Sequence, residues 1–195
     1  MVNFKKDKKY YILGGIIAFI LIVGVYIFMI NSNKMEFVIE TNQGKIVIEL
    51  YPDKAPITVG NFLQYVNNQG YDNTVFHRVI NGFMIQGGGF MQDGSKKKTN
   101  SPIKLESNNG LTNKRGSIAM ARTNIPDSAT NQFFINTNDN DFLDYGVRDE
   151  GYAVFGQVVS GMDIIDKIQL VETTTKFGMS DWPVEDIVIN KIYIK

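Results

Sequence analysis

The sequence contains no cysteine and a single histidine, His77. Without cysteine, disulfide bonds, thiol nucleophiles and cysteine-based zinc sites are excluded. This absence does not identify a compartment, because exported proteins can also do without disulfides. No serine or cysteine nucleophile motif accompanies His77, so a structural role is expected, with an acid-base role as the alternative. We expect neither a metal ion nor a cofactor.

The chain also lacks a net charge, since 20 lysines and arginines balance 20 acidic residues. The balance hides an asymmetry along the chain. Residues 1–34 hold five lysines and one aspartate, a net charge of +4, so residues 35–195 carry −4. A mildly acidic domain has no basic surface with which to neutralise phosphates, and we expect no nucleic-acid partner.

A phosphate-binding loop is missing as well. The three consecutive glycines, Gly87 to Gly89, resemble such a loop only superficially. They are not followed by the Gly-Lys-Ser/Thr ending or by a helix pattern, so nucleotide binding is not expected.

Charged residues are absent from the run of 21 residues between Tyr10 and Ile30. At about 1.5 Å per residue, a helix of this length covers roughly 31 Å, enough for a hydrocarbon core of about 30 Å. The run is longer than the apolar part of a signal peptide, and residues 30–34 offer no small-residue cleavage site. A transmembrane helix over residues 10–30 is therefore predicted; a cleaved signal peptide and a buried core helix are the alternatives.

Lysines are concentrated before this run, and only Lys34 follows it closely. By the positive-inside rule, residues 1–9 form a basic cytoplasmic tail. Residues 31–35 then form a linker, and residues 36–195 form a domain on the outer side of the membrane. The expected topology is single-pass, with the amino terminus in the cytoplasm.

Short apolar segments separated by glycine-rich turns dominate residues 36–195. Residues 37–40 and 46–50 flank Asn42-Gln43-Gly44, which predicts a β-hairpin. Pro56 opens a predicted helix, because the apolar residues after it recur at helical spacing. Further strands are expected at 75–80, 83–86, 117–121, 132–136, 153–159 and 187–194, with a second helix at 162–168. This pattern by itself favours a β-barrel or β-sandwich with two helices.

The most informative segment runs from Phe76 to Gly88. It consists largely of β-forming residues, and Asn81-Gly82 in its middle is a tight-turn dipeptide. Alternation along the strands lets Arg78 and Gln86 point to one face beside an apolar floor. A planar cationic donor over a hydrophobic pocket suits a neutral, bulky substrate that carries an amide to be polarised.

This segment resembles the signature of the cyclophilins, the peptidyl-prolyl cis-trans isomerases. Two further blocks carry the same resemblance, which extends from about Glu36 to Lys195. The first is Met120-Ala121-Arg122 followed by Asn131 to Ile135, and the second is Phe142-Leu143-Asp144 followed by Gly151 to Gly156. The resemblance implies a mainly β fold, a closed eight-stranded antiparallel barrel capped by two helices. It also implies an enzyme that accelerates X-Pro isomerisation in proline-containing polypeptides.

The resemblance assigns roles to individual residues. It implies that Arg78 and Gln86 are the catalytic residues, with Arg78 stabilising the twisted amide and Gln86 holding the main chain of the substrate. It implies that the remaining site residues bind substrate: Phe83, Met84, Phe134 and Leu143 as the proline pocket; Ala121, Gln132 and the backbone of Arg122 along the groove; Phe142 where many eukaryotic members have tryptophan; and Tyr152 where they have histidine.

Each assignment has a plainer alternative. Arg78 alone could be a surface arginine paired with a carboxylate, and Gln86 could merely end a strand. The pocket residues could belong to an ordinary core, which is the preferred interpretation for Phe133.

Four departures from the family pattern are typical of a bacterial branch, and Phe142 and Tyr152 are two of them. In addition, Gly89 replaces an aspartate that often ends the first motif, and the loop from Tyr145 to Gly151 is longer than in compact eukaryotic members. These departures put inhibitor binding in doubt but leave catalysis in place. We therefore expect a monomeric isomerase anchored in a bacterial cell membrane, with a periplasmic or extracytoplasmic domain that acts on exported or membrane proteins. The alternatives are a proline-binding or chaperone module with incidental turnover and an anchored structural β-domain.

Overall fold

The computed structural model describes residues 16, 19 and 35–195. The predicted tail and transmembrane helix, residues 1–9 and 10–30, and nearly all of the linker lie outside the described residues, apart from Ile16, Phe19 and Met35. Within the part of the chain that is described, no helix is both long enough and apolar enough to cross a membrane.

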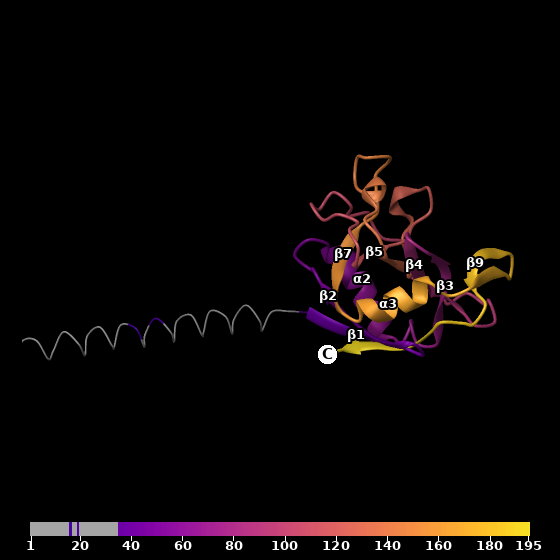
Figure 1. Ribbon diagram of the computed structural model, residues 1–195. Helices are drawn as coiled ribbons and strands as arrows, with labels where there is room; N and C mark the ends of the chain where they lie inside the picture. The colour runs from indigo at the N-terminus through magenta and orange to yellow at the C-terminus, as the bar shows by residue number, and fades with distance from the viewer. Residues whose placement is uncertain (1–15, 17–18, 20–34) are drawn as a thin grey trace, which may run out of the picture. The chain divides into compact units, whose positions relative to one another are not determined.

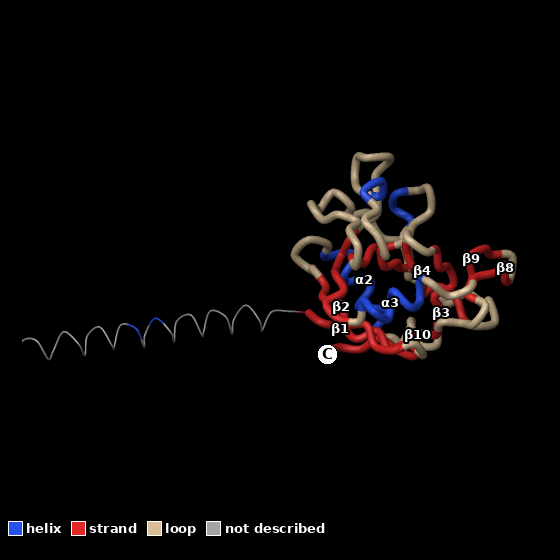
Figure 2. Tube along the Cα trace, viewed as in Figure 1, coloured by secondary structure: helices blue, strands red, loops and turns tan. Residues whose placement is uncertain are grey.

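Strands account for most of the regular structure in residues 35–195 (Figures 1 and 2). The two α-helices there are α2 (Pro56–Asn67) and α3 (Met162–Gln169). The strands are β1 (Met35–Thr41), β2 (Gly44–Leu50), β3 (Thr74–Ile80), β4 (Met84–Met91), β5 (Ser117–Met120), β6 (Phe133–Asn136), β7 (Val154–Ser160), β8 (Thr173–Lys176), β9 (Met179–Pro183) and β10 (Val188–Ile194).

Eight of these strands close into a barrel in the order β1-β10-β3-β4-β6-β5-β7-β2. Every neighbouring pair is antiparallel. The closed eight-stranded antiparallel barrel is therefore confirmed. Closure pairs every strand on both sides, so the barrel leaves no unpaired edge.

Both helices cover the interior of the barrel. Pro56 opens α2 at its first turn, and the side chain of Phe62 is fully buried. The Phe62 ring lies 5.0–5.7 Å, centroid to centroid, from the rings of Tyr71, Phe133 and Phe155. Two of the three isoleucines of α3, Ile165 and Ile168, join the same core cluster and are also 0% exposed. Both predicted helices are confirmed, and the apolar face of each one explains its position.

The prediction for β4 was wrong at both ends. Phe83 lies in the turn before the strand, and β4 continues past Gln86 through the three glycines. Glycine usually weakens a strand, but here the core approaches the backbone closely. A Cβ at Gly87 would lie 2.9 Å from the Phe76 ring, and one at Gly88, whose φ is +85°, would lie 2.9 Å from Tyr71.

The hairpin formed by β8 and β9 was not predicted. Three of the four residues of β8 are exposed, and β9 ends on Pro183, so neither segment shows a strand pattern in the sequence. Trp182 attaches the hairpin to the barrel, since its side chain is 0% exposed and packs with Val75 of β3 and Phe90 of β4. The hairpin lies beside β3 in Figures 1 and 2.

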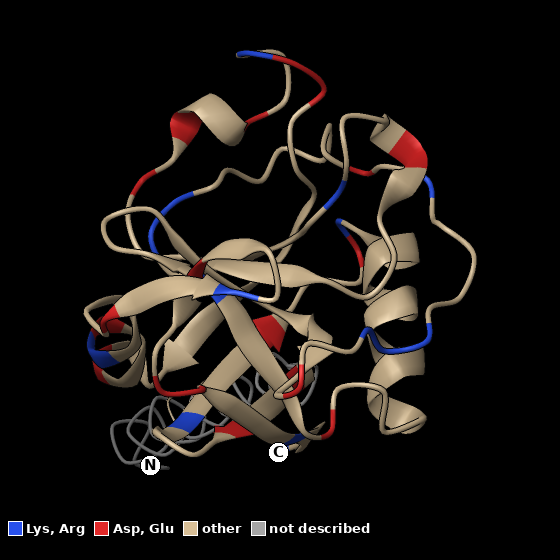
Figure 3. Cartoon of the chain, turned by 90° about the vertical axis from the view of Figure 1, so that its right-hand side faces the viewer, with Lys and Arg blue, Asp and Glu red and all other residues tan. Residues whose placement is uncertain are grey.

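Charged residues of both signs are interspersed over the side of the domain shown in Figure 3. Several form ion pairs between elements far apart in sequence, such as Arg115 with Asp166 at 2.8 Å. Lys195 pairs with Glu36 at 2.7 Å and so joins the last strand to the first.

Candidate active site

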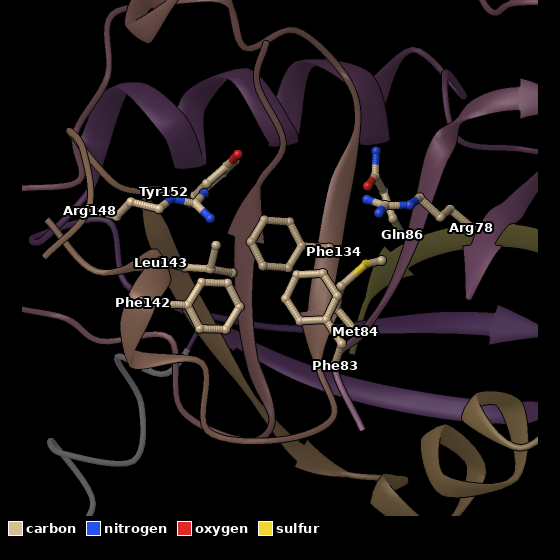
Figure 4. A pocket seen from close by; sticks show the side chains of 9 residues that line it. All are labelled: Arg78, Phe83, Met84, Gln86, Phe134, Phe142, Leu143, Arg148 and Tyr152. Atoms are coloured by element: carbon tan, nitrogen blue, oxygen red, sulfur yellow. The ribbon is translucent and has the colours of Figure 1, made fainter. Parts of the chain in front are cut away.

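Arg78 and Gln86 face each other across the β3–β4 pair. The tight turn at Asn81-Gly82, with φ of +70° at the glycine, folds β4 back on β3 and makes Arg78 and Gln86 direct cross-strand partners. Both side chains line one cavity, as strand alternation predicted (Figure 4).

This cavity has a volume of about 340 Å³. Figure 4 shows Arg78 and Gln86 at one end, Arg148 and Tyr152 at the other, and apolar side chains between them. The structure thus brings together eight of the predicted site residues and adds one that was missed, Arg148: the lining consists of Arg78, Phe83, Met84, Gln86, Phe134, Phe142, Leu143, Arg148 and Tyr152.

Aromatic contacts shape the apolar part of this cavity. Phe134 of β6 meets the edge of Tyr152 with the ring centroids 5.6 Å apart. Phe83 stacks on Phe142 at the same centroid separation, 5.6 Å. The guanidinium of Arg148 lies 5.6 Å from the Phe142 ring, within cation–π range. The cavity therefore has an aromatic floor, with the cations of Arg78 and Arg148 at its two ends.

The other predicted groove residues line a second, smaller hollow. Ala121, Arg122 and Gln132 border a cavity of about 140 Å³ that shares Gln86 with the larger one. The Nε2 of Gln86 donates to Oε1 of Gln132 at 2.8 Å. The two cavities therefore meet at a hydrogen-bonded pair of glutamines.

The side chain of Arg122 has a function that the resemblance did not assign. It is 3% exposed, and its Nε and Nη2 donate to the carbonyl of Gly151 and to Asp149, at 2.8 and 2.7 Å. Its guanidinium also covers the Tyr152 ring at 4.6 Å. A hydrogen bond from the Gly151 N–H and the nearby Arg122 charge hold the pKa of Asp149 below its usual range. Arg122 thus fastens the loop that places Arg148 at the cavity.

Three buried asparagines hold the backbone of two residues that line the cavity of about 340 Å³, Phe83 and Leu143. Asn140 donates to the carbonyl of Phe83 at 2.8 Å, and Asn113 donates to the carbonyl of Leu143 at 3.1 Å. Asn136, at the end of β6, connects the other two. Sequence reasoning missed Asn113 and Asn140 because asparagine in a loop is normally interpreted as a solvated turn residue. Asn136 ends a predicted strand, and nothing in its sequence indicates a buried network.

Arg78 also contacts the β8–β9 hairpin. Its Nε lies 3.5 Å from Oδ2 of Asp181, and the two side chains are 42% and 37% exposed. Arg78 is therefore paired with a carboxylate, as the alternative of a surface arginine predicted, but it also lines the cavity.

His77 lines neither of these two cavities. It is 5% exposed and packs against Phe90 and Trp182, with ring centroids 4.6 and 6.0 Å away. Burial lowers the pKa of His77 from 6.5 to about 4, so the ring is neutral near pH 7. These contacts fit the structural role expected for it. Across the described residues, no cluster of three or more His, Asp or Glu side chains could hold a metal ion.

Known proteins of one family are similar to most of this chain. A family model described as "Cyclophilin type peptidyl-prolyl cis-trans isomerase/CLD" matches residues 36–194. The chain belongs to the cyclophilin family. It is accordingly a peptidyl-prolyl cis-trans isomerase, and its barrel with two helices is the cyclophilin fold.

Bacterial cyclophilins are among its similar relatives. Peptidyl-prolyl cis-trans isomerase A of Dickeya dadantii is 56% identical over 141 residues, 72% of this chain and 74% of that protein. Peptidyl-prolyl cis-trans isomerase B of Escherichia coli is 54% identical over 147 residues, 74% of this chain and 90% of that protein. A cyclophilin of Cryptosporidium parvum, crystallised in the presence of the dipeptide Ala-Pro, matches with a TM-score of 0.68 at 27% identity, covering 82% of this chain and 98% of that one.

Proposed function

We propose that Arg78 accelerates rotation about X-Pro bonds while the proline ring rests on the apolar floor of the larger cavity. Rotation is slow because amide resonance must be lost, which produces a barrier of about 18–20 kcal/mol. Uncatalysed exchange takes tens to hundreds of seconds. Turnover in milliseconds requires an acceleration of about 10⁴-fold, or roughly 5.5 kcal/mol.

A guanidinium can supply much of this stabilisation. As the amide twists, the prolyl nitrogen becomes pyramidal and gains a lone pair that accepts a hydrogen bond. A donor placed there stabilises the twisted state alone, which is the condition for a higher turnover rate. One preorganised donor in a partly dry site contributes about 3–4 kcal/mol. This route uses neither a covalent intermediate nor a proton transfer.

The observation that carries the proposal is the position of Arg78 and Gln86 at one end of an apolar cavity of about 340 Å³. Phe134 and Met84, 4% and 2% exposed, provide a floor for a prolyl ring. The substrates that we propose are proline-containing polypeptides, and the Ala-Pro dipeptide used with the Cryptosporidium parvum cyclophilin has this chemistry.

Replacement of Arg78 tests the mechanism. Arg78→Ala is expected to lower kcat/KM by about 10²–10³ on a proline-containing peptide, with the fold unchanged by circular dichroism. Arg115→Ala is the matched control, because Arg115 is also 42% exposed and paired with a carboxylate, Asp166. Activity of Arg78→Ala within a factor of two or three of the wild type would rule the mechanism out. A proline-binding or chaperone module, the alternative, predicts that client refolding survives the loss of turnover.

We further propose that the chain is a monomer anchored by residues 10–30, with the isomerase domain on the outer side of a bacterial cell membrane. The charge-free run of 21 residues and the lysines before it support this topology. Exported and membrane proteins would then be its clients. Protease added to intact cells is expected to degrade the domain and leave the cytoplasmic tail. A mature protein that begins near residues 31–35 by mass spectrometry would contradict the anchor.

A further inference from the structure

We propose that Asp181 is a positioning residue whose carboxylate orients the guanidinium of Arg78. The inference rests on the proposed catalytic role of Arg78. Asp181 Oδ2 lies 3.5 Å from Nε of Arg78. The two residues are 103 positions apart in sequence, and the β8–β9 hairpin brings them together.

The hairpin holds Asp181 in a defined place. The next residue, Trp182, is 0% exposed, and its Nε1 donates to Oδ1 of Asp186 at 2.8 Å. Lys176 of β8 donates to the same carboxylate oxygen at 3.0 Å. The Trp182 ring also packs beside His77, the neighbour of Arg78 on β3. Asp181 therefore directly precedes an anchored tryptophan that packs against β3, the strand that carries Arg78.

A local irregularity directs the carboxylate toward Arg78. Thr174 pairs with Trp182 and Lys176 pairs with Met179, so the single residue between the threonine and the lysine stands opposite two residues of β9. Such bulges redirect side chains and occur next to active sites. Asp181 has a φ of +62°, in the left-handed region, which aspartate and asparagine tolerate better than most residues.

The pairing uses the Nε edge of the guanidinium. Arginine presents five N–H donors in a planar fork, so a carboxylate at Nε leaves the terminal nitrogens free for the cavity that Arg78 lines. Arg78 also lines another depression, of about 370 Å³, together with Met179 and Ser180 of the hairpin. Without the carboxylate, the long arginine side chain could turn further into this depression and leave the cavity that it shares with Gln86.

Asp181→Asn is the decisive variant. Asparagine matches aspartate in size and tolerates the left-handed backbone, so the change removes only the charge. We expect kcat to fall about two- to fivefold, the scale of an exposed ion pair, with KM changed by less than twofold. The deficit relative to wild type is expected to shrink in 1 M salt, where the Debye length is about 3 Å. Glu185→Gln, an exposed carboxylate after the same hairpin, is the control and is expected to match wild type.

A double-mutant cycle separates this inference from the proposed function. Asp181→Asn is expected to have no further effect on kcat once Arg78 is alanine. In the protein that retains Arg78, Asp181→Asn is expected to shift the Arg78 Nε–Hε resonance in NMR spectra. If Arg78→Ala itself retains activity, the proposed mechanism fails. If Arg78→Ala is slow but Asp181→Asn has an unchanged or higher kcat, only the positioning role of Asp181 is overturned. The positioning role is also overturned if Asp181→Asn lowers kcat by the same factor with Arg78 present and with Arg78 replaced by alanine, because the two residues then act independently.

Discussion

Two adjacent phenylalanines of β6 belong to different regions of the molecule. Phe133 is 0% exposed and packs inside the barrel against Phe62 and Tyr71. Phe134 is 4% exposed and packs outside the barrel wall with Met84 and Leu143. Their burial is nearly equal, yet one lies in the fold's core and the other in the candidate active site. The face of the strand, rather than burial, separates structure from function here.

The two regions differ in what closes them. The barrel interior is sealed by α2 and α3, whose apolar faces fill it. The outer cluster is covered only by loops that Arg122 and buried asparagines hold in place, and it leaves a hollow of about 340 Å³. A close-packed core resists any loss of volume, whereas an open site can refill with water or ligand. The same substitution should therefore have different consequences on the two faces.

Phe133→Ala is expected to have the largest effect. Removing a fully buried ring leaves a cavity that the surrounding aromatic rings cannot fill, which costs about 3–5 kcal/mol of unfolding free energy. Urea unfolding at low temperature measures this loss, and the molecules that remain folded should keep kcat/KM close to wild type. A loss of stability below about 1 kcal/mol would mean that the barrel interior is not close-packed at this position.

A pH effect extends the comparison to His77, which lies in neither cluster but beneath the β8–β9 hairpin. Burial lowers its pKa from 6.5 to about 4 in the folded state. Above pH 6.5 the ring is neutral in both the folded and the unfolded state, so the protonation of His77 takes nothing from the free energy of unfolding. Between pH 6.5 and 4 the unfolded state binds the proton first, and roughly 3 kcal/mol is lost as pH falls through this window. Unfolding curves at several pH values measure the slope.

His77→Gln provides the control for that slope, because glutamine does not titrate. Its stability should be lower at pH 7 but nearly constant between pH 6.5 and 5, before unfolded carboxylates begin to bind protons. Equal slopes for wild type and variant in that interval would show that His77 is more accessible to solvent than its 5% exposure implies.

Phe134→Ala is the counterpart of Phe133→Ala on the other face. The space it vacates joins an existing hollow that water can enter, so the loss of stability should be smaller than at Phe133. Binding should suffer instead, because a prolyl ring loses its apolar floor, and kcat/KM should fall about 10- to 100-fold, mainly through KM. A stability loss as large as that of Phe133→Ala with unchanged KM would erase the distinction between the two regions.

Sequence patterns predicted the barrel strands well in segments where alternating apolar residues are bounded by turn residues. The first hairpin and α2 follow from periodicity and from Pro56. The expectation that Arg78 and Gln86 share one face also agrees with the structure, where both line one cavity. Closure of the barrel came from the resemblance, since pairing between distant strands such as β1 and β10 leaves no signal in one sequence.

The elements that the sequence did not reveal are those fixed by distant contacts. β8 reads as a polar loop, and it becomes a strand because Trp182 attaches its partner β9 to the barrel. Asp181 reaches Arg78 only through that hairpin. Arg148 lines the cavity because Arg122 fastens its loop through Asp149. The unusual length of the loop from Tyr145 to Gly151 was the one available signal for this part of the site.

The smallest expected effect concerns polar groups at the edge of the outer region, where Gly89 replaces the aspartate common in the family. A Cβ at Gly89 would lie 2.6 Å from the side chain of Gln132, whose Oε1 accepts a hydrogen bond from Gln86 at 2.8 Å. The end of a glutamine side chain moves easily, so Gly89→Ala should cost less than about 1 kcal/mol of stability. Gln86 would lose its acceptor, and kcat/KM should fall about two- to tenfold, the scale of one hydrogen bond. Gly60→Ala is the matched control, because a Cβ there would have no neighbour within 4 Å, and activity should not change. If Gly89→Ala is as active as wild type, the glutamine pair does not position substrate, and the outer region would depend on its apolar floor and Arg78 alone.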